Sequence, residues 1–221
     1  MKNLYNALQL KQLYQLRNLG YKYTLAKPFS YEEQNSLKLP NTIEELKVQA
    51  KNCHLCSLSK GRKQTVFGEG AFDADIMIVG DIPMEIEDSE GRPFLGKGGE
   101  MLTLMIEKVL GLPREEAYLT NLIKCHSSSS QELDETQIHT CKAYLFKEIE
   151  LIRPKVIVTL GELAYHYISG EQSSLEEARG LVIEKENYMI IPTYHPNSLL
   201  KNPSLKIKVF EDLKKIRSNM L

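Results

Sequence analysis

The sequence lacks any apolar run that approaches the ~20 residues needed to span a bilayer, so we expect no transmembrane helix. Residues 1–23 carry a polar residue every few positions and lack the apolar core of a signal peptide, which indicates a cytoplasmic protein. Low-complexity tracts and internal repeats are also missing. With 221 residues, 42% hydrophobic and 26% charged, the composition favours a globular chain of one domain plus an extension.

The chain also lacks an excess of charge of either sign. Its net charge of −1 gives no indication of nucleic-acid binding. The charge is unevenly distributed, however, since residues 1–31 hold five basic residues and no acidic one, and residues 201–221 hold six basic against two acidic. Local basic faces of this kind serve phosphates in some proteins, and each run alone is equally typical of a solvated helix face.

The hydrophobic pattern predicts strands that alternate with helices. Short apolar segments bounded by turn residues indicate strands at 76–79, 117–120 and 156–160, with further candidates at 181–184 and 188–191. Capping residues and terminal glycines or prolines predict helices at 42–52, 101–110, 134–152, 162–168 and 204–220. This order predicts an α/β fold, in which a three-layer α/β/α arrangement surrounds a central, mostly parallel, four-stranded sheet.

Residues 1–44 are predicted to form an extension to a domain that spans residues 45–221. Leucines recur at roughly helical spacing over residues 4–18, which predicts an amphipathic helix, and residues 24–41 hold two prolines among polar residues, as in a linker. This N-terminal helix is a candidate site for a replication or repair protein, although packing on its own domain is the simpler interpretation. We expect the chain to be a monomer without membrane contact.

The segment Asp73–Gly99 is predicted to carry the ligand site. It begins as a buried strand and breaks at Gly80 into a polar loop with four acidic side chains, Asp81, Glu85, Glu87 and Asp88. It ends in the glycines 96, 98 and 99, which open a helix. Open α/β sheets bind ligands beyond the carboxyl ends of their strands, and glycines at a helix N-terminus leave backbone N–H groups free for a phosphate.

The four cysteines, at positions 53, 56, 125 and 141, are compatible with three interpretations. The first is a CxxC redox pair with two unrelated core cysteines, since a lone cysteine is often a small buried hydrophobe. The second is a zinc site, which usually shows two CxxC-like knuckles, whereas Cys125 and Cys141 are separated by fifteen residues. The third is an iron–sulfur cluster, which tolerates irregular spacing. Spacing favours a metal but does not separate zinc from iron–sulfur.

Five segments together resemble the family 4 uracil-DNA glycosylases over residues 45–221. They are Cys53-x2-Cys56, GDIPMEIEDSEGRPFLGKGGEML (80–102), TNLIKC (120–125), Cys141 and TYHPNSLL (193–200). The resemblance implies a DNA repair enzyme of base excision repair that flips out uracil, hydrolyses its N-glycosidic bond and leaves an abasic site. It also implies a 4Fe-4S cluster in preference to zinc, bound by Cys53, Cys56, Cys125 and Cys141, and a substrate of DNA that contains uracil or another damaged base.

The resemblance also implies the residues of the site. The catalytic pair is a carboxylate and a histidine, Asp81 and His195. The substrate-binding residues implied are Ile82 close to the base, Glu87 to exclude bulkier bases, Phe94 to stack on the base, and Asn121, whose amide would read the uracil edge. These residue types suit the chemistry, because a carboxylate steadies positive charge on the sugar or orients a water, and a histidine N–H stabilises negative charge on the leaving base. An amide matches the donor and acceptor of a uracil edge, and a phenyl face stacks on an extruded base.

The sequence departs from the family pattern, chiefly at the start of the segment 80–102. Asp81 replaces a glutamate, and Ile82 and Met84 add bulk where the family has small residues. His126 begins a His-Ser-Ser segment in place of Arg-Pro-Pro, and Asn197 follows His-Pro in place of serine. An alternative function is therefore an iron–sulfur DNA-binding protein of the same fold with weak, altered or no glycosylase activity. A zinc- or thiol-based redox protein unrelated to repair is a third hypothesis.

Overall fold

The computed structural model describes residues 38–127 and 133–220. The chain from Leu39 onward groups into one compact unit. The helix predicted at residues 4–18 lies outside the described residues, so the N-terminal extension stays a prediction. Among the described helices, none is both long and apolar enough to cross a membrane.

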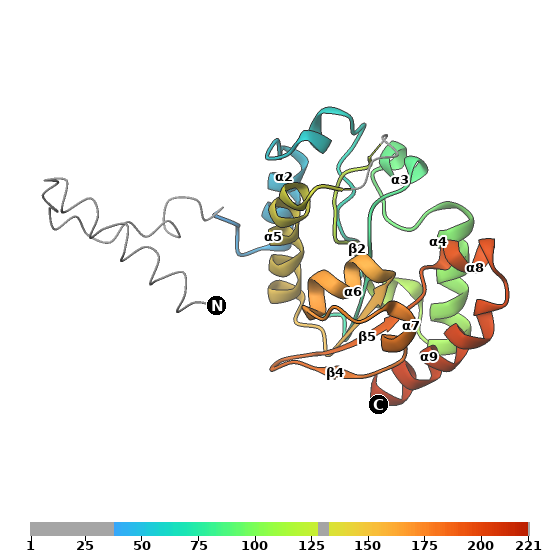
Figure 1. Cartoon of the computed structure of the whole chain (residues 1–221). Coiled ribbons are helices and arrows are strands. Elements are labelled where there is room, and N and C mark those ends of the chain that lie inside the picture. The colour runs from blue at the N-terminus through green and yellow to red at the C-terminus, as the bar shows by residue number, and fades with distance from the viewer. Residues whose placement is uncertain (1–37, 128–132, 221) are drawn as a thin grey trace, which may run out of the picture. The chain divides into compact units, whose positions relative to one another are not determined.

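Five strands form one sheet in the order β2-β1-β3-β5-β4 (Figure 1). Their bounds are Ile76–Gly80 for β1, Tyr118–Asn121 for β2, Val156–Leu160 for β3, Ile183–Glu184 for β4 and Met189–Thr193 for β5. The first three and β5 pair in parallel, whereas β4 pairs antiparallel with β5 at the sheet edge. The predicted mostly parallel sheet is confirmed. The sheet has one strand more than the predicted four, because both candidate segments, 181–184 and 188–191, contribute a strand, β4 and β5.

Helices cover both faces of the sheet, which confirms the three-layer α/β/α prediction (Figure 1). One face packs on α4 (Gly96–Leu104), the π-helical turn η2 (Met105–Leu110) and α9 (Leu205–Met220), with α8 (Pro196–Lys201) beside them. The other face carries α5 (Glu135–Ile152), against which α2 (Ile43–Lys51) packs. The helices α6 (Glu162–Ser169) and α7 (Leu175–Ala178) follow β3, and the short helices η1 (Ser57–Lys60) and η3 (Arg114–Glu116) lie in connections.

Side chains alternate between the two faces of the sheet along each strand, and they build the core between these layers. In β1, Ile76 and Ile78 point to the face covered by α4 and α9, and all five residues of the strand are buried. A strand that is apolar at every position is typical of a parallel sheet covered on both faces. This burial fixes the position of the sheet between the helices, and therefore the position of the loops at its carboxyl edge.

The segment after β1 is the main correction to the predicted elements. It was predicted as a polar loop, but Glu85–Glu90 forms a short helix, α3. The Glu87 carboxylate accepts the backbone N–H of Met84 at the helix start, and Gly91 ends the helix with φ of 69°. A side-chain bond to the first turn and a left-handed glycine at the end are recognised helix boundaries. The predicted helix opening at Gly96 is confirmed.

Candidate active site

The carboxyl ends of three parallel strands, β1, β2 and β5, bring the predicted site residues to one edge of the sheet. Asn121 is the last residue of β2 and lies in register with Gly80, the last residue of β1. Asp81 follows β1 directly, and His195 lies two residues beyond the end of β5. Because parallel strands end at the same edge, residues 81, 121 and 195 converge there from distant parts of the chain.

Phe94 and Asn121 meet beside Gly80. A Cβ on Gly80 would lie 2.4 Å from Oδ1 of Asn121 and 2.9 Å from Cζ of Phe94, so only glycine leaves room for both. Both side chains are buried, and Nδ2 of Asn121 has no hydrogen-bond partner among the described residues. An unpartnered buried donor is costly, at about 1–3 kcal/mol, which marks a place where a ligand acceptor would be stabilising.

His195, in the connection between β5 and α8, packs against Phe94. The two rings are stacked, with centroids 6.2 Å apart and planes inclined by 29°. His195 caps α8, and its Nδ1 accepts the backbone N–H of Asn197 at 3.2 Å. Burial lowers the pKa of His195 to about 4, so the ring is neutral near pH 7. Because Nδ1 is an acceptor, the single ring proton sits on Nε2, which leaves this atom as a donor.

Asp81 points to the start of α6. Its Oδ1 accepts the backbone N–H of Ala164 at 2.7 Å. Its Oδ2 lies over Gly161, where an added Cβ would be 2.4 Å away. Burial raises the pKa of Asp81 to about 6, and the nearby Glu162 adds to the rise, while the bond from Ala164 opposes it. A half-buried carboxylate that titrates near neutral pH is suited to acid–base or electrostatic work.

Glu87 has both carboxylate oxygens occupied by the backbone around Phe94. Oε2 accepts the N–H of Met84 at 2.6 Å, and Oε1 accepts the N–H of Leu95 at 3.2 Å. Burial raises the pKa of Glu87, although these backbone bonds oppose the rise. The geometry therefore shows Glu87 bracing the loop. Ile82 is half-buried next to Asp81, whereas Met84 is half exposed.

The four cysteines line one cavity between α2, α5 and the segment after β2. The guanidinium of Arg62 donates to Sγ of Cys125 at 3.1 Å, and the backbone N–H of Lys124 donates to Sγ of Cys141 at 3.2 Å. Burial raises the pKa of the Cys141 thiol to about 12, while Lys124 opposes this rise. Within residues 38–127 and 133–220, no group of three or more His, Cys, Asp or Glu side chains is arranged to hold a metal ion.

Sequence reasoning missed several residues that support the site. Gly161 and the N–H of Ala164 hold Asp81, and the end of the strand predicted at 156–160 was the signal that could have found them. Arg114 and Lys124 hold the backbone at Phe94 and Asn121, respectively. No local pattern marks these two, because each acts through contacts made by the tertiary fold.

Comparison with known proteins shows the family to which the chain belongs. The family model of the uracil DNA glycosylase superfamily matches residues 67–214. The chain is 40% identical to the type-4 uracil-DNA glycosylase of Sulfurisphaera tokodaii, over 80% of this chain and 84% of that protein. The type-4 enzymes of Saccharolobus solfataricus and Thermotoga maritima are 38% and 36% identical, over 76% and 80% of this chain and 82% and 93% of theirs.

The fold is the α/β fold of a DNA glycosylase superfamily. The chain belongs to the type-4 family of the uracil DNA glycosylase superfamily. This confirms the family resemblance. It also confirms the prediction of a hydrolase that acts on N-glycosidic bonds.

Proposed function

We propose that this chain removes uracil from DNA by hydrolysis of the N-glycosidic bond and leaves an abasic site. The observation that carries the proposal is the buried, unpartnered Nδ2 of Asn121 beside the ring of Phe94. A uracil stacked on Phe94 would offer its O4 as acceptor to Nδ2 and its N3–H as donor to Oδ1. Cytosine reverses both groups on that edge, so the same amide would leave it unpaired.

The leaving base needs a donor for its developing negative charge. His195, which is uncharged at neutral pH and carries its proton on Nε2, supplies this donor. Its ring stacks on Phe94, which places it next to the proposed position of the base. A fixed donor of this kind stabilises an oxyanion, and loss of one typically costs about 10²–10³ in rate.

The sugar needs a negative group or an activated water. Asp81 is our candidate, because its Oδ1 is anchored by Ala164 at the start of α6 and its Oδ2 remains for a water or the sugar. The aspartate side chain is one methylene shorter than the family glutamate. Its hydrogen bond from the N–H of Ala164 in α6 fixes the position of the carboxylate. Above its pKa of about 6, Asp81 is negatively charged and can stabilise the positive charge on the sugar.

Glu87 and Ile82 are proposed to shape the pocket. Glu87 fixes the loop before and after Phe94 through Met84 and Leu95, so its removal would loosen the stacking face. Ile82 is proposed to contact one edge of the base, where its bulk narrows the pocket. Both roles would affect discrimination between bases more than the chemical step.

We propose that the four cysteines bind an iron–sulfur cluster. They line one cavity, and N–H donors from Arg62 and Lys124 reach two of the sulfurs, which offsets part of the effect of burial against their thiolate forms. When bound, the cluster would crosslink the segment before β1, the loop after β2 and α5.

DNA is the proposed macromolecular partner, and the basic residues of α9 and of residues 1–31 are candidates for phosphate contacts. The test is an assay on duplex and single-stranded oligonucleotides that hold one uracil, hypoxanthine, thymine or cytosine, with alkali to cleave abasic sites. We expect cleavage at uracil, and a loss of about 10²-fold or more for His195→Ala and for Asp81→Ala. Wild-type protein with its cluster intact and no base release would reject the proposal in favour of DNA binding without excision.

A further inference from the structure

Phe94 is held in a strained backbone conformation. Its φ is 55°, in the left-handed region that L-residues with bulky side chains avoid at a cost of roughly 1–2 kcal/mol. Strain of this kind persists only where the surroundings fix it, and it occurs most often at functional sites. Gly99 is part of these surroundings, because an added Cβ there would lie 1.8 Å from the carbonyl oxygen of Phe94.

The guanidinium of Arg114 holds the same segment through its carbonyl groups. Its Nη2 donates to the carbonyl oxygens of Pro93 and Phe94, both at 3.2 Å. Its Nη1 donates to Oγ1 of Thr103 at 3.0 Å and to the carbonyl oxygen of Gly99 at 3.4 Å. One planar group thus joins the strained residue to α4, and a lysine, with its single nitrogen, could not reproduce all four bonds.

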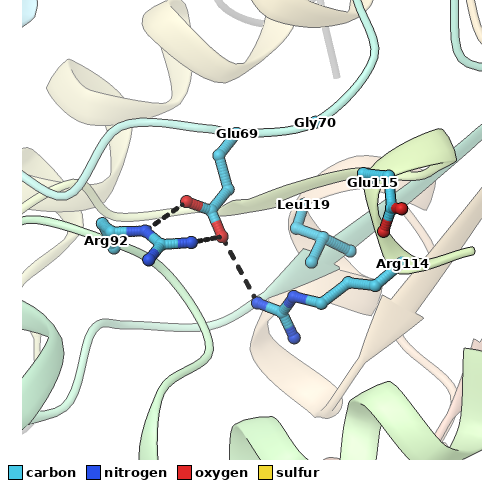
Figure 2. A pocket seen from close by; sticks show the side chains of 6 residues that line it. All are labelled: Glu69, Gly70, Arg92, Arg114, Glu115 and Leu119. Carbon is cyan, nitrogen blue, oxygen red and sulfur yellow. Dashed lines mark hydrogen bonds and ion pairs between the residues drawn. The ribbon is translucent and has the colours of Figure 1, made fainter.

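Arg114 is itself held by Glu69. Figure 2 shows the Glu69 carboxylate between two arginines: Oε1 lies 3.4 Å from Nη2 of Arg114, and Arg92 donates to the carboxylate at 2.9 and 3.3 Å. The three side chains line a cavity of about 280 Å³. The Arg114 side chain is 19% exposed and that of Arg92 is 63% exposed. Arg92 and Arg114 therefore share a carboxylate, but Arg114 reaches the backbone of Phe94.

We propose that Arg114, anchored by Glu69, is a positioning residue that fixes the backbone of Phe94 and so sets the stacking face for the flipped base. The effect on uracil release rests on the proposed function. The effect on the Phe94 backbone does not. Glu87 accepts the N–H of Leu95, the next residue. Arg114 and Glu87 therefore hold the peptide bond between Phe94 and Leu95, one at its carbonyl oxygen and the other at its N–H.

The activity test compares Arg114→Met with Arg92→Met. Both variants remove one arginine from Glu69, and only the first removes the bonds to Phe94. We expect kcat/KM for uracil release to fall roughly 10–100-fold for Arg114→Met, since a shift of about 1 Å at a reacting site has effects of that size, and less than about threefold for Arg92→Met. Both are measured well below their unfolding temperatures.

A double-mutant cycle separates positioning from general stability. In a Phe94→Ala background, Arg114→Met should lower kcat/KM by less than about threefold, because the group that it positions is gone. An equal loss in both backgrounds would overturn the proposal, as would equal losses for Arg114→Met and Arg92→Met.

A second measurement does not depend on activity. The chain has six phenylalanines, so selective ¹³C and ¹⁵N labelling gives a short set of signals in which Phe94 is assigned by Phe94→Leu. Backbone ¹³Cα and amide shifts depend on φ, and we expect them to move for Phe94 in Arg114→Met but not in Arg92→Met. Unmoved shifts would overturn the proposal even if the wild type released no uracil. Moved shifts in an inactive wild type would reject the proposed function and leave the positioning role standing.

Discussion

The ammonium group of Lys124 donates a hydrogen bond of 2.7 Å to the backbone carbonyl oxygen of Asn121. The same ammonium pairs with Glu148 on α5 and donates to Oγ1 of Thr120 at 2.6 Å. Glu148 also accepts the hydroxyl of Tyr118 at 3.0 Å. The ion pair is buried, with side-chain exposures of 2% for Lys124 and 0% for Glu148. It therefore ties α5 to the end of β2, where Asn121, the residue proposed to read the base, lies.

This pair gives a prediction on stability. Lys124→Met removes one partner of a buried ion pair and leaves the Glu148 charge uncompensated, so we expect the free energy of unfolding to fall by about 3–5 kcal/mol. Urea denaturation at pH 7 measures the change. Lys155→Met is the control, because its pair with Asp75 is exposed and should contribute at most about 1 kcal/mol. Equal losses in the two variants would contradict the assignment of a buried, mutually dependent pair.

Two glycines with positive φ give a prediction on the position of Asp81. Gly161 has φ of 106° and lies under the Asp81 carboxylate, whereas Gly170 has φ of 77° and open space around it. Alanine at either position costs about 1 kcal/mol or more in stability, because the left-handed backbone disfavours a Cβ. Alanine at 161 must also displace Asp81.

We therefore expect Gly161→Ala to lower the rate of uracil release by roughly 10–100-fold and Gly170→Ala to leave it nearly unchanged. Single-turnover rates on a uracil oligonucleotide, measured at a temperature where both variants are folded, decide between them. A Gly161→Ala variant with the wild-type rate would remove the carboxylate of Asp81 from the proposed chemistry.

The pH dependence of kcat/KM should show one ionisation between pH 5 and 8. Burial raises the pKa of Asp81 to about 6, and the proposed role needs the charged form, so activity should rise tenfold per pH unit below 6 and level off above it. His195, whose pKa burial lowers to about 4, stays neutral over this range and adds no limb. Asp81→Asn should flatten the residual profile. A wild-type profile that is flat from pH 5 to 8 would contradict a functional Asp81 with a raised pKa.

The sequence predicts well those features that depend on local pattern. Apolar runs bounded by turn residues located β1, β2 and β3, and parallel pairing then brings their ends together without further information. The helix α3 was missed, because Glu85–Glu90 is polar apart from Ile86 and gains its order from the Glu87 bond to Met84 and from Gly91.

Residues that hold the site from behind were also missed. Arg114 contacts a residue 20 positions away, and Lys124 pairs with Glu148, 24 positions away. From the sequence alone, a charged side chain is predicted to be exposed to solvent unless its partner is known. Only the packing of α4 and α5 on the sheet brings these partners together. The candidate site residues themselves were predicted through motif similarity rather than through periodicity.

The cysteine cavity gives a prediction on metal content. Anaerobically purified chain should contain about four iron atoms and four sulfide ions with little zinc, and it should show visible charge-transfer absorption. The Cys141→Ser variant should lose most of its iron, because Cys141 is one of the proposed cluster ligands. Its Sγ is buried and accepts the backbone N–H of Lys124. Ser59→Ala is the matched control, since Ser59 lines the same cavity and offers no thiol.

The cluster should stabilise the fold by joining three segments that are distant in sequence. Chelation of the iron should therefore lower the unfolding temperature of the wild type and leave that of an iron-free Cys141→Ser variant unchanged. Elemental analysis and thermal unfolding are run on the same preparations. One zinc per chain with no sulfide would establish a zinc site instead, and four freely titrating thiols with no metal would exclude both.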